Sequence, residues 1–213
     1  MVAMAVVRPI FQPAWQPPGR PDGTDLPLAS LLGRLTQIAS GPQGGGSTVA
    51  AALVRKAQRQ REPVAWVQWQ GGSLYPPDLH AQGIALEALL VVHVGEAQQA
   101  QERLRAAELL LRSGGFGLVV VDLTCGRLPT GLAWQHRLHQ WARQHHSAVV
   151  LLTQGATDAE GPSLGALISL QLVPRRQALG DGLFEQGCAI GKNKLGQALE
   201  PWQWLACGPP GLR

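Results

Sequence analysis

The feature that most constrains the fold of this chain is a glycine-rich segment between a strand pattern and a helix pattern. Residues 41–48 read GPQGGGST. The segment fits the phosphate-binding template G-x-x-x-x-G-K-[S/T] at Gly41, Gly46 and Thr48, but Ser47 stands where the template has lysine. Residues 34–39 alternate polar and apolar side chains as a strand does, and residues 48–61 are rich in helix formers. This order favours a phosphate loop over a flexible glycine turn.

The chemistry of such a loop depends on its backbone and on its lysine. Glycines let backbone N–H groups face phosphate oxygens, and the helix that follows aims its positive end at them. Without the lysine, no point charge in the loop reaches the β- and γ-phosphates. We therefore expect a degenerate nucleotide-binding loop. Its candidate residues are Gly41, Gly44, Gly45, Gly46, Ser47 and Thr48.

The second predicted strand also departs from an active ATPase. Residues 63–69 read PVAWVQW, and in P-loop ATPases of the strand-exchange type an acidic residue after this strand activates the attacking water. Residues 63–77 contain no Asp or Glu, and Gln70 and Gly71 stand at the expected place. Glutamine can orient a water but cannot accept its proton at neutral pH. We predict a protein that is not an enzyme, with no catalytic residue, no metal and no cofactor.

Two further strands end in polar residues. The predicted strand 116–122 ends in Asp122, and the strand 147–154 ends in Gln154, which places an amide at the same edge of the sheet. Asp122 either holds the water shell of a Mg²⁺ ion with Thr48 as partner or caps its turn and bonds the hydroxyl of Ser47 or Thr48. The sequence leaves both alternatives open.

The composition indicates a surface that other molecules cover. The chain has 213 residues, enough for one domain with a full core, and its charged fraction of 15% is below the usual level of about 25%. Seven tryptophans accompany this low charge, and the net charge of +4 permits contact with nucleic acid or acidic partners without requiring it. The three cysteines form no C-x-x-C pair, so we expect a reducing, cytoplasmic location. No leader or membrane-spanning run is evident, and no membrane partner is expected.

The density of prolines along the chain predicts two regions. Residues 1–33 contain six prolines, which exclude a long helix, so we predict a proline-rich N-terminal arm at 1–33 and a core domain at 34–213. The arm carries Phe11 and Trp15. It is either a disordered tail or an extended arm whose aromatic side chains dock on a partner or on the body of the protein.

Further candidate interface residues lie in the second half of the chain. Trp134 and Trp141 fall on one face of a helix predicted at 130–144. Lys192 and Lys194 flank the turn between the last two strands. They form either an ordinary basic hairpin tip or a pair of cations that reach for phosphate across a subunit boundary. The histidines of the predicted helix fit a solvated face better than a metal site.

These motifs, in this order, resemble the RecA-like core over about residues 31–206. The Gly-Pro opening of the loop, the strand to Asp122, Thr153-Gln154 and Lys-Asn-Lys at 192–194 carry the resemblance, together with Gly-Glu-Ala-Gln-Gln-Ala at 95–100. The resemblance implies an α/β fold with a P-loop core. Its central sheet is mostly parallel and flanked by helices, with antiparallel strands near the C-terminus.

The differences from RecA indicate which RecA-like family this chain resembles. The loops after the Asp122 and Gln154 strands are short, and both the lysine and the catalytic acid are missing. The chain looks like the ImuA family, and it also resembles the shorter SulA, a cell-division inhibitor with a RecA fold. The ImuA resemblance implies a non-catalytic adaptor in SOS-induced, error-prone translesion DNA synthesis and DNA repair. Its implied partners are RecA, ImuB and the error-prone polymerase of the mutagenesis complex, with Lys192 and Lys194 as interface cations.

Two alternatives stay open. The glycine loop, Asp122, Arg175, Arg176 and the net charge of +4 are compatible with a nucleotide-dependent, DNA-binding RecA-like protein. For the adaptor itself, contact with DNA is expected to be indirect or weak. A SulA-like cell-division inhibitor rests on fold analogy alone.

Overall fold

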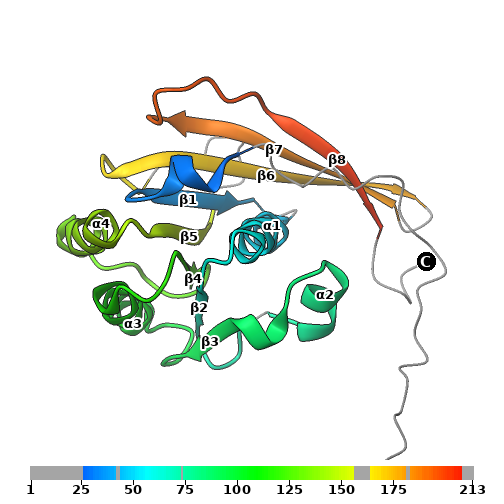
Figure 1. The fold of residues 1–213 in the computed structure, drawn as a ribbon. Coiled ribbons are helices and arrows are strands. Elements are labelled where there is room, and N and C mark those ends of the chain that lie inside the picture. Colours follow the sequence, from blue (N-terminus) through cyan, green and yellow to red (C-terminus); the bar gives the residue numbers. More distant parts are fainter. Residues whose placement is uncertain (1–25, 42–43, 73, 156–163, 181–182, 208–213) are drawn as a thin grey trace, which may run out of the picture.

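One eight-stranded sheet forms the centre of the protein (Figure 1). The computed structural model describes residues 26–41, 44–72, 74–155, 164–180 and 183–207. The strand order is β3-β2-β4-β5-β1-β6-β7-β8. The pairs from β3 to β6 are parallel, whereas β6–β7 and β7–β8 are antiparallel. The strands are β1 (Leu35–Ser40), β2 (Val64–Gln68), β3 (Leu89–His93), β4 (Leu118–Leu123), β5 (Ala148–Gln154), β6 (Ile168–Gly180), β7 (Leu183–Asn193) and β8 (Trp202–Cys207).

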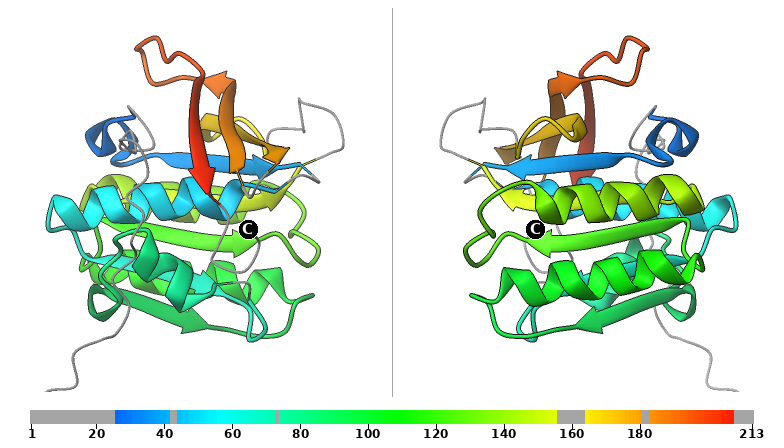
Figure 2. Two further views of the ribbon diagram at one scale, coloured as in Figure 1. Left: turned by 90° about the vertical axis from the view of Figure 1, so that its right-hand side faces the viewer. Right: turned by 90° about the vertical axis from the view of Figure 1, so that its left-hand side faces the viewer.

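Helices cover the parallel part of the sheet on both faces (Figure 2). One core cluster joins the sheet to α1, α2 and the short 3₁₀ helix η1, and the other joins it to α3 and α4. Strands buried on both faces explain the nearly continuous apolar runs of β4 and β5. The helices are η1 (Leu28–Leu31), α1 (Gly46–Arg59), α2 (Pro76–Ala81), η2 (Leu86–Ala88), α3 (Ala100–Ser113) and α4 (Ala133–His145).

The predicted fold class is confirmed: the protein is α/β, with a mostly parallel, helix-flanked sheet and antiparallel strands at its C-terminal end. Two details of the sheet depend on contacts between distant segments. Strand β6 continues to Gly180 because it pairs with β7 along its whole second half. Strand β3 is mostly apolar, as a strand covered on both faces would be, yet it lies at the edge of the sheet and its His93 is exposed.

The described part of the predicted arm packs on the core. Leu26, Leu28 and Leu31 are each at most 1% exposed and belong to the cluster that contains α1. The ammonium group of Lys56 in α1 donates a hydrogen bond to the carbonyl oxygen of Leu26 over 2.7 Å. The segment from residue 26 to the start of β1 is therefore part of the body of the protein, and the boundary at residue 33 stays a prediction.

Candidate functional site

The glycine-rich segment forms a turn between β1 and α1, as its strand and helix patterns predicted. The amide of Gly44 donates to the carbonyl of Gly41 over 3.0 Å, and Gly45 is the N-cap of α1. The φ angles of Gly44 and Gly45 are 76° and 97°, a region that strongly favours glycine. No side chain caps the helix at Gly45. Pro42 and Gln43 lie outside the described residues.

Side chains of the sheet occupy the space beside the loop. A Cβ atom added at Gly46 would clash with Oγ of Ser40, so the serine hydroxyl lies directly against this glycine. A Cβ atom at Gly45 would lie 3.2 Å from Oε1 of Gln186 and 3.3 Å from Cβ of Pro174. The loop is thus packed against β1 on one side and against the antiparallel strands β6 and β7 on another.

The candidate hydroxyls of the loop differ in exposure. Ser47, at the lysine position, is exposed, and Thr48 is partly buried in the first turn of α1. Gln186 of β7, which faces the loop, is 3% exposed and its Oε1 has no hydrogen-bond partner. The atoms nearest to Cβ positions added at Gly45 and Gly46 belong to Ser40, Ile38, Pro174 and Gln186, and none of these side chains is charged.

The end of β2 carries amides where an active ATPase has an acid. Gln68 is 2% exposed, and its Nε2 lies 3.5 Å from Nδ1 of His93. Gln70 is exposed, and its backbone N–H donates to the carbonyl of Gly95 over 3.3 Å. The short connection that follows β2 therefore offers neutral groups to the edge of the sheet.

Asp122 lies at the same edge, in β4, and is 3% exposed. Its Oδ1 accepts hydrogen bonds from the amide and the hydroxyl of Thr124, over 3.0 Å and 2.6 Å. The carboxylate thus caps the turn after its own strand, as one alternative predicted. The predicted donors were wrong, however, because Thr124 takes the place that was expected for Ser47 or Thr48. Strand β5 lies between β4 and the loop strand β1.

A buried arginine accompanies Asp122, and sequence reasoning missed it. Arg103 of α3 is 0% exposed, and its guanidinium donates to the carbonyl oxygens of Glu96, Ala97 and Cys125. Burial lowers the pKa of Arg103, and the negative charge of Asp122 partly opposes this shift. Arg103 ties the loop after β3 to the loop after β4. The available signal was its position on the buried helix stripe with Ala100, Leu104 and Ala107.

Gln154 ends β5, as predicted, and β5 lies between β4, which carries Asp122, and the loop strand β1. Ser40 and Gln154 are register partners, and the amide of Gly155 donates to the carbonyl of Ser40 over 2.6 Å. The side chain of Gln154 is exposed. The structure therefore brings the loop, Asp122 and Gln154 to one edge of the sheet, in the order that parallel strands impose.

The side chains of Lys192 and Lys194 donate hydrogen bonds within the chain. The ammonium of Lys192 donates to the carbonyl of Gly165 over 2.7 Å, and that of Lys194 donates to the carbonyl of Ala166 over 3.2 Å. Burial lowers the pKa of Lys192, and the neighbouring charge of Lys194 lowers it further. The two lysines thus hold the turn before β6. Their role as interface cations stays a prediction.

Two buried glutamines hold the same turn. The amide N–H of Leu164 donates to Oε1 of Gln37 over 3.0 Å, and Nε2 of Gln135 donates to the carbonyl of Leu164 over 2.8 Å. Both glutamines are 2% exposed, and Gln37 also donates to the hydroxyl of Thr153 over 3.0 Å. Four side chains therefore fix residues 164–166: Gln37 of β1, Gln135 of α4, Lys192 of β7 and Lys194 just after β7. We call these four side chains the polar clamp.

The predicted interface aromatics lie in different environments. Phe11 and Trp15 are outside the described residues. Trp134 is 5% exposed and belongs to the core between α4 and the sheet, so it presents little surface to a partner. Trp141 is partly exposed; its ring stacks on His145, with centroids 6.1 Å apart, and the guanidinium carbon of Arg112 lies 5.6 Å from its centre.

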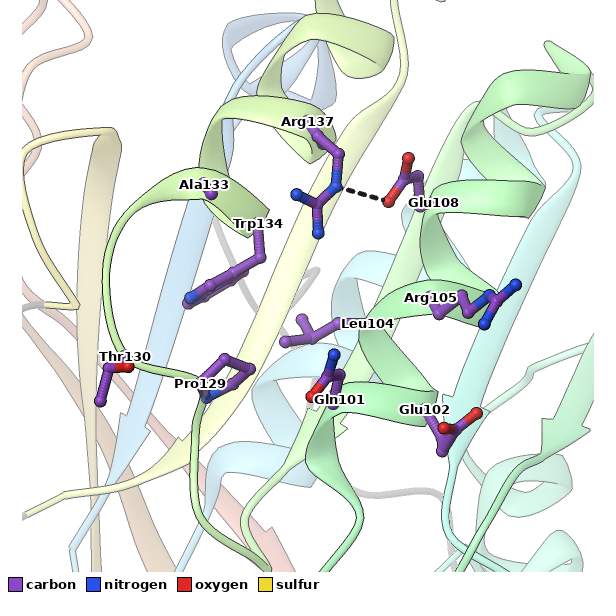
Figure 3. A pocket seen from close by; sticks show the side chains of 10 residues that line it. All are labelled: Gln101, Glu102, Leu104, Arg105, Glu108, Pro129, Thr130, Ala133, Trp134 and Arg137. Atoms are coloured by element: carbon purple, nitrogen blue, oxygen red, sulfur yellow. Dashed lines mark hydrogen bonds and ion pairs between the residues drawn. The ribbon is translucent and has the colours of Figure 1, made fainter.

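A hollow of about 290 Å³ lies between α3 and α4 (Figure 3). Leu104 and Trp134 line its inner part, and the ion pair between Glu108 and Arg137, at 2.9 Å, joins the two helices at its rim. A second hollow, of about 260 Å³, lies on β6–β8 beside Arg175. The residues that line either hollow do not include the glycine loop.

The described part of the chain contains neither a cluster of metal ligands nor a membrane-spanning helix. Over these residues, no three His, Cys, Asp or Glu side chains are grouped as a metal site requires. Within the same ranges, no helix is both long enough and apolar enough to cross a membrane.

Comparison with known proteins found similarity to RecA over part of the chain. RecA of Deinococcus radiodurans is 35% identical over 97 residues, which are 46% of this chain and 26% of the relative. RecA of Thermus thermophilus is 33% identical over 97 residues, 27% of its length, and that of Fusobacterium nucleatum is 30% identical over 97 residues, 25% of its length. No protein-family model matches the chain.

The chain spans about a quarter of the length of these curated relatives. The similarity agrees with the strand–loop–helix unit at β1 and α1 and with the mostly parallel sheet. Together these observations support a RecA-like core.

Proposed function

We propose that this chain is a non-catalytic, RecA-like adaptor of the ImuA type, which acts in the cytoplasm in SOS-induced, error-prone translesion DNA synthesis. In this role it binds RecA and, in the mutagenesis complex, ImuB with its error-prone polymerase, and it touches DNA weakly or indirectly. The similarity to RecA supports a RecA-like protein connected with DNA repair.

The residues at the loop do not fit a hydrolysable magnesium–nucleotide complex, which supports a non-catalytic role. Ser47 brings no charge, and the segment after β2 brings no carboxylate. One oxygen of Asp122 already accepts two hydrogen bonds from Thr124. Loss of one preorganised transition-state charge costs on the order of 10² to 10³ in rate, and loss of the general base adds a comparable factor.

The observation that carries the adaptor role is the open edge at β3. Among the described strands, β3 pairs with β2 alone, and its side chains are only partly buried. Leu90 is 45% exposed, and Leu86 and Tyr75 on the adjoining segments are 37% and 61% exposed. The strand contains no Asp, Glu, Lys, Arg or Pro, the residues that often protect such edges. An extended segment of a partner can therefore add to the sheet here, with exposed apolar side chains beside it.

The test compares two surface leucines. Leu90→Lys places a charge on the β3 edge, whereas Leu109→Lys places the same charge on α3, where Leu109 is 57% exposed. We expect Leu90→Lys to weaken binding to purified RecA or ImuB by roughly tenfold or more, because the lysine charge would lose its hydration in an apolar contact. A tenfold change in affinity corresponds to about 1.4 kcal/mol of binding free energy. Leu109→Lys should bind like the unchanged chain. Biolayer interferometry measures both, with circular dichroism as the check on folding.

Two outcomes would contradict the proposal. The first is absence of binding to both RecA and ImuB at micromolar concentration. The second is steady ATP hydrolysis by the purified chain that Asp122→Ala abolishes, which would favour the nucleotide-dependent, DNA-binding alternative. A mobility shift with DNA at two salt concentrations then measures the charge contribution to DNA binding.

A further inference from the structure

The positive charge of the chain is concentrated where α1, α3 and α4 end and where β1, β2, β4 and β5 begin, at the edge of the sheet opposite the glycine loop (Figure 2). The segments before these four strands are residues 32–34, 59–63, 112–117 and 143–147, which we call the amino edge. They contain five arginines and one glutamate, a net charge of +4, which equals that of the whole chain. The arginines are Arg34, Arg59, Arg61, Arg112 and Arg143. Lys194 beside β1 and Glu87 before β3 flank the amino edge and leave this charge unchanged.

Hydrogen bonds join the four segments of the amino edge into one surface. The amide of Gly117 donates to the carbonyl of Pro63 over 3.0 Å. The hydroxyl of Ser147 donates to the carbonyl of Phe116 over 2.7 Å. The amide of Gly33 in turn donates to the carbonyl of Ser147 over 2.9 Å. The segments therefore lie side by side in the order of their strands, β2-β4-β5-β1.

Two helices end at the amino edge in a backbone conformation that favours glycine, yet a basic residue stands there. Arg61, directly after the C-cap of α1, has a φ angle of 61°, and His146, the C-cap of α4, has a φ angle of 53°. In the described part of the chain, all other positive φ angles belong to glycines, including Gly114 at the end of α3. The helix dipole favours cations in the whole last turn and does not require one at this position. Side chains in this conformation often mark positions with a functional role.

The amino edge is charged but has no large exposed apolar side chain, which indicates the class of partner. Among the described residues, eight large apolar side chains are exposed, and none of them lies in the four segments. Interfaces between proteins have an apolar core, and membrane-surface helices insert apolar side chains into the lipid. Nucleic-acid interfaces are instead polar and positively charged. The five cations are all arginines, whose planar guanidinium groups suit phosphate oxygens. These features favour a nucleic acid over an acidic protein or a membrane.

We propose that the amino edge binds the phosphate backbone of a nucleic acid without reading its sequence. Arg61, Arg112 and Arg143 are exposed and come from three different segments, so each can contact a different phosphate. The guanidinium carbon of Arg112 lies 5.6 Å from the centre of the Trp141 ring, a contact that restricts the arginine before a ligand arrives. The inference rests on the proposed function only for the weak DNA contact named there, and it assigns that contact to a surface.

The test compares two double variants that remove the same charge. Arg61→Gln/Arg143→Gln changes the amino edge, whereas Arg105→Gln/Arg127→Gln removes two arginines that are exposed elsewhere. The probes are a fluorescent single-stranded DNA of about 20 nucleotides and its duplex, measured by anisotropy at several salt concentrations. We expect the amino-edge variant to bind roughly tenfold more weakly at low salt, and its salt slope to fall by about 1.4 for the single strand or about 1.8 for the duplex. The control variant should change affinity by about twofold or less. The form that binds more tightly identifies the preferred nucleic acid.

Arg61→Gly separates the binding role of this residue from its effect on folding. Glycine suits the φ angle at position 61, so urea unfolding should show equal or higher stability, while affinity for the DNA probes should fall severalfold. Lower stability with unchanged affinity would show that Arg61 is structural and would contradict the proposal.

Four other outcomes would overturn the proposal. They are absence of binding to both probes at about 100 μM protein in low salt, equal losses in the two double variants, a requirement for ATP, and displacement of the probe by polyglutamate as readily as by unlabelled DNA. The last would favour an acidic protein partner. Binding to RecA without DNA should be unchanged in Arg61→Gln/Arg143→Gln and is tested separately by Leu90→Lys. Failure at the amino edge is therefore distinguishable from failure of the proposed function.

Discussion

The parallel and the antiparallel parts of the sheet differ in how many of their side chains are buried. All six residues of β4 are buried, since helices cover both faces of that strand. In β7, only Gln186 and Cys188 are buried, because the outer face of the antiparallel end has no helix over it. The inner parallel strands β1, β2, β4 and β5 thus bury nearly every side chain, and these side chains contribute to stability. The antiparallel end leaves alternate positions free for contacts with other molecules.

The largest effect is expected at Arg103 of α3, a helix that packs on the parallel part of the sheet. Arg103→Ala removes the donor to three carbonyl oxygens and leaves a cavity, so we expect a loss of about 3–5 kcal/mol in the free energy of unfolding. Arg105→Ala, on the exposed side of the same helix, should change it by about 0.5 kcal/mol or less. Urea unfolding measures both. Equal effects of the two substitutions would show that the Arg103 contacts contribute little.

A matched pair of strand leucines sharpens the comparison directly. Leu151 of β5 is 0% exposed and Leu205 of β8 is 55% exposed. We expect Leu151→Ala to cost about 2–5 kcal/mol through lost burial and a residual cavity, and Leu205→Ala about 0.5 kcal/mol or less. Denaturant melts at low protein concentration test this. A large loss for Leu205→Ala would mean that the outer face of β8 is covered.

Two side chains of the polar clamp come from different parts of the sheet: Gln37 lies in the parallel part and Lys194 follows the antiparallel strand β7. Both bond the turn at residues 164–166, so their contributions to stability can be compared directly. Gln37→Ala removes a buried acceptor from the amide of Leu164, so we expect a loss of about 1–3 kcal/mol in unfolding free energy. Lys194→Ala removes an exposed donor to Ala166 in the same turn and should cost less than about 1 kcal/mol. Amide hydrogen exchange at residues 164–166 gives a local readout. Faster exchange in Lys194→Ala than in Gln37→Ala would reverse the ranking.

The smallest effect concerns the cysteine in the antiparallel end. Burial raises the pKa of the Cys188 thiol to about 12 from its ordinary value of 9.0. The thiol therefore stays neutral at pH 8, and its contribution to stability is present below about pH 9 and is lost as the pH rises toward 12. In a Cys207→Ser background, we expect a thiol reagent at pH 8 to modify Cys125 well before Cys188. Modification of Cys188 at the same rate would show that β7 opens readily.

Local patterns predicted the order of the elements well. The template around Gly41–Thr48 gave strand, loop and helix, and the polar ends of the strands to Asp122 and Gln154 gave the edge where they meet. These predictions depend on short-range periodicity and on the rule that parallel strands align their carboxyl ends. Both can be evaluated along the chain without knowing which strand neighbours which.

Contacts between distant segments were not predictable in this way. The exposure of His93 follows from the edge position of β3, which depends on the strand order of the whole sheet. Arg103 interrupts an apolar stripe, and its carbonyl partners lie in two loops whose approach no local pattern reveals. The ammonium groups of Lys192 and Lys194 likewise find acceptors in a turn that precedes a different strand.

Ser40 and Gly46 limit which residue the loop can carry at its last glycine. Any side chain at position 46 would bring its Cβ atom against Oγ of Ser40, so the packing of α1 on β1 requires glycine there, whatever the loop binds. The positive φ angles of Gly44 and Gly45 favour glycine for a second, independent reason. Backbone and packing constraints therefore maintain the glycines of this loop, and a chain that shares them need not share a nucleotide ligand.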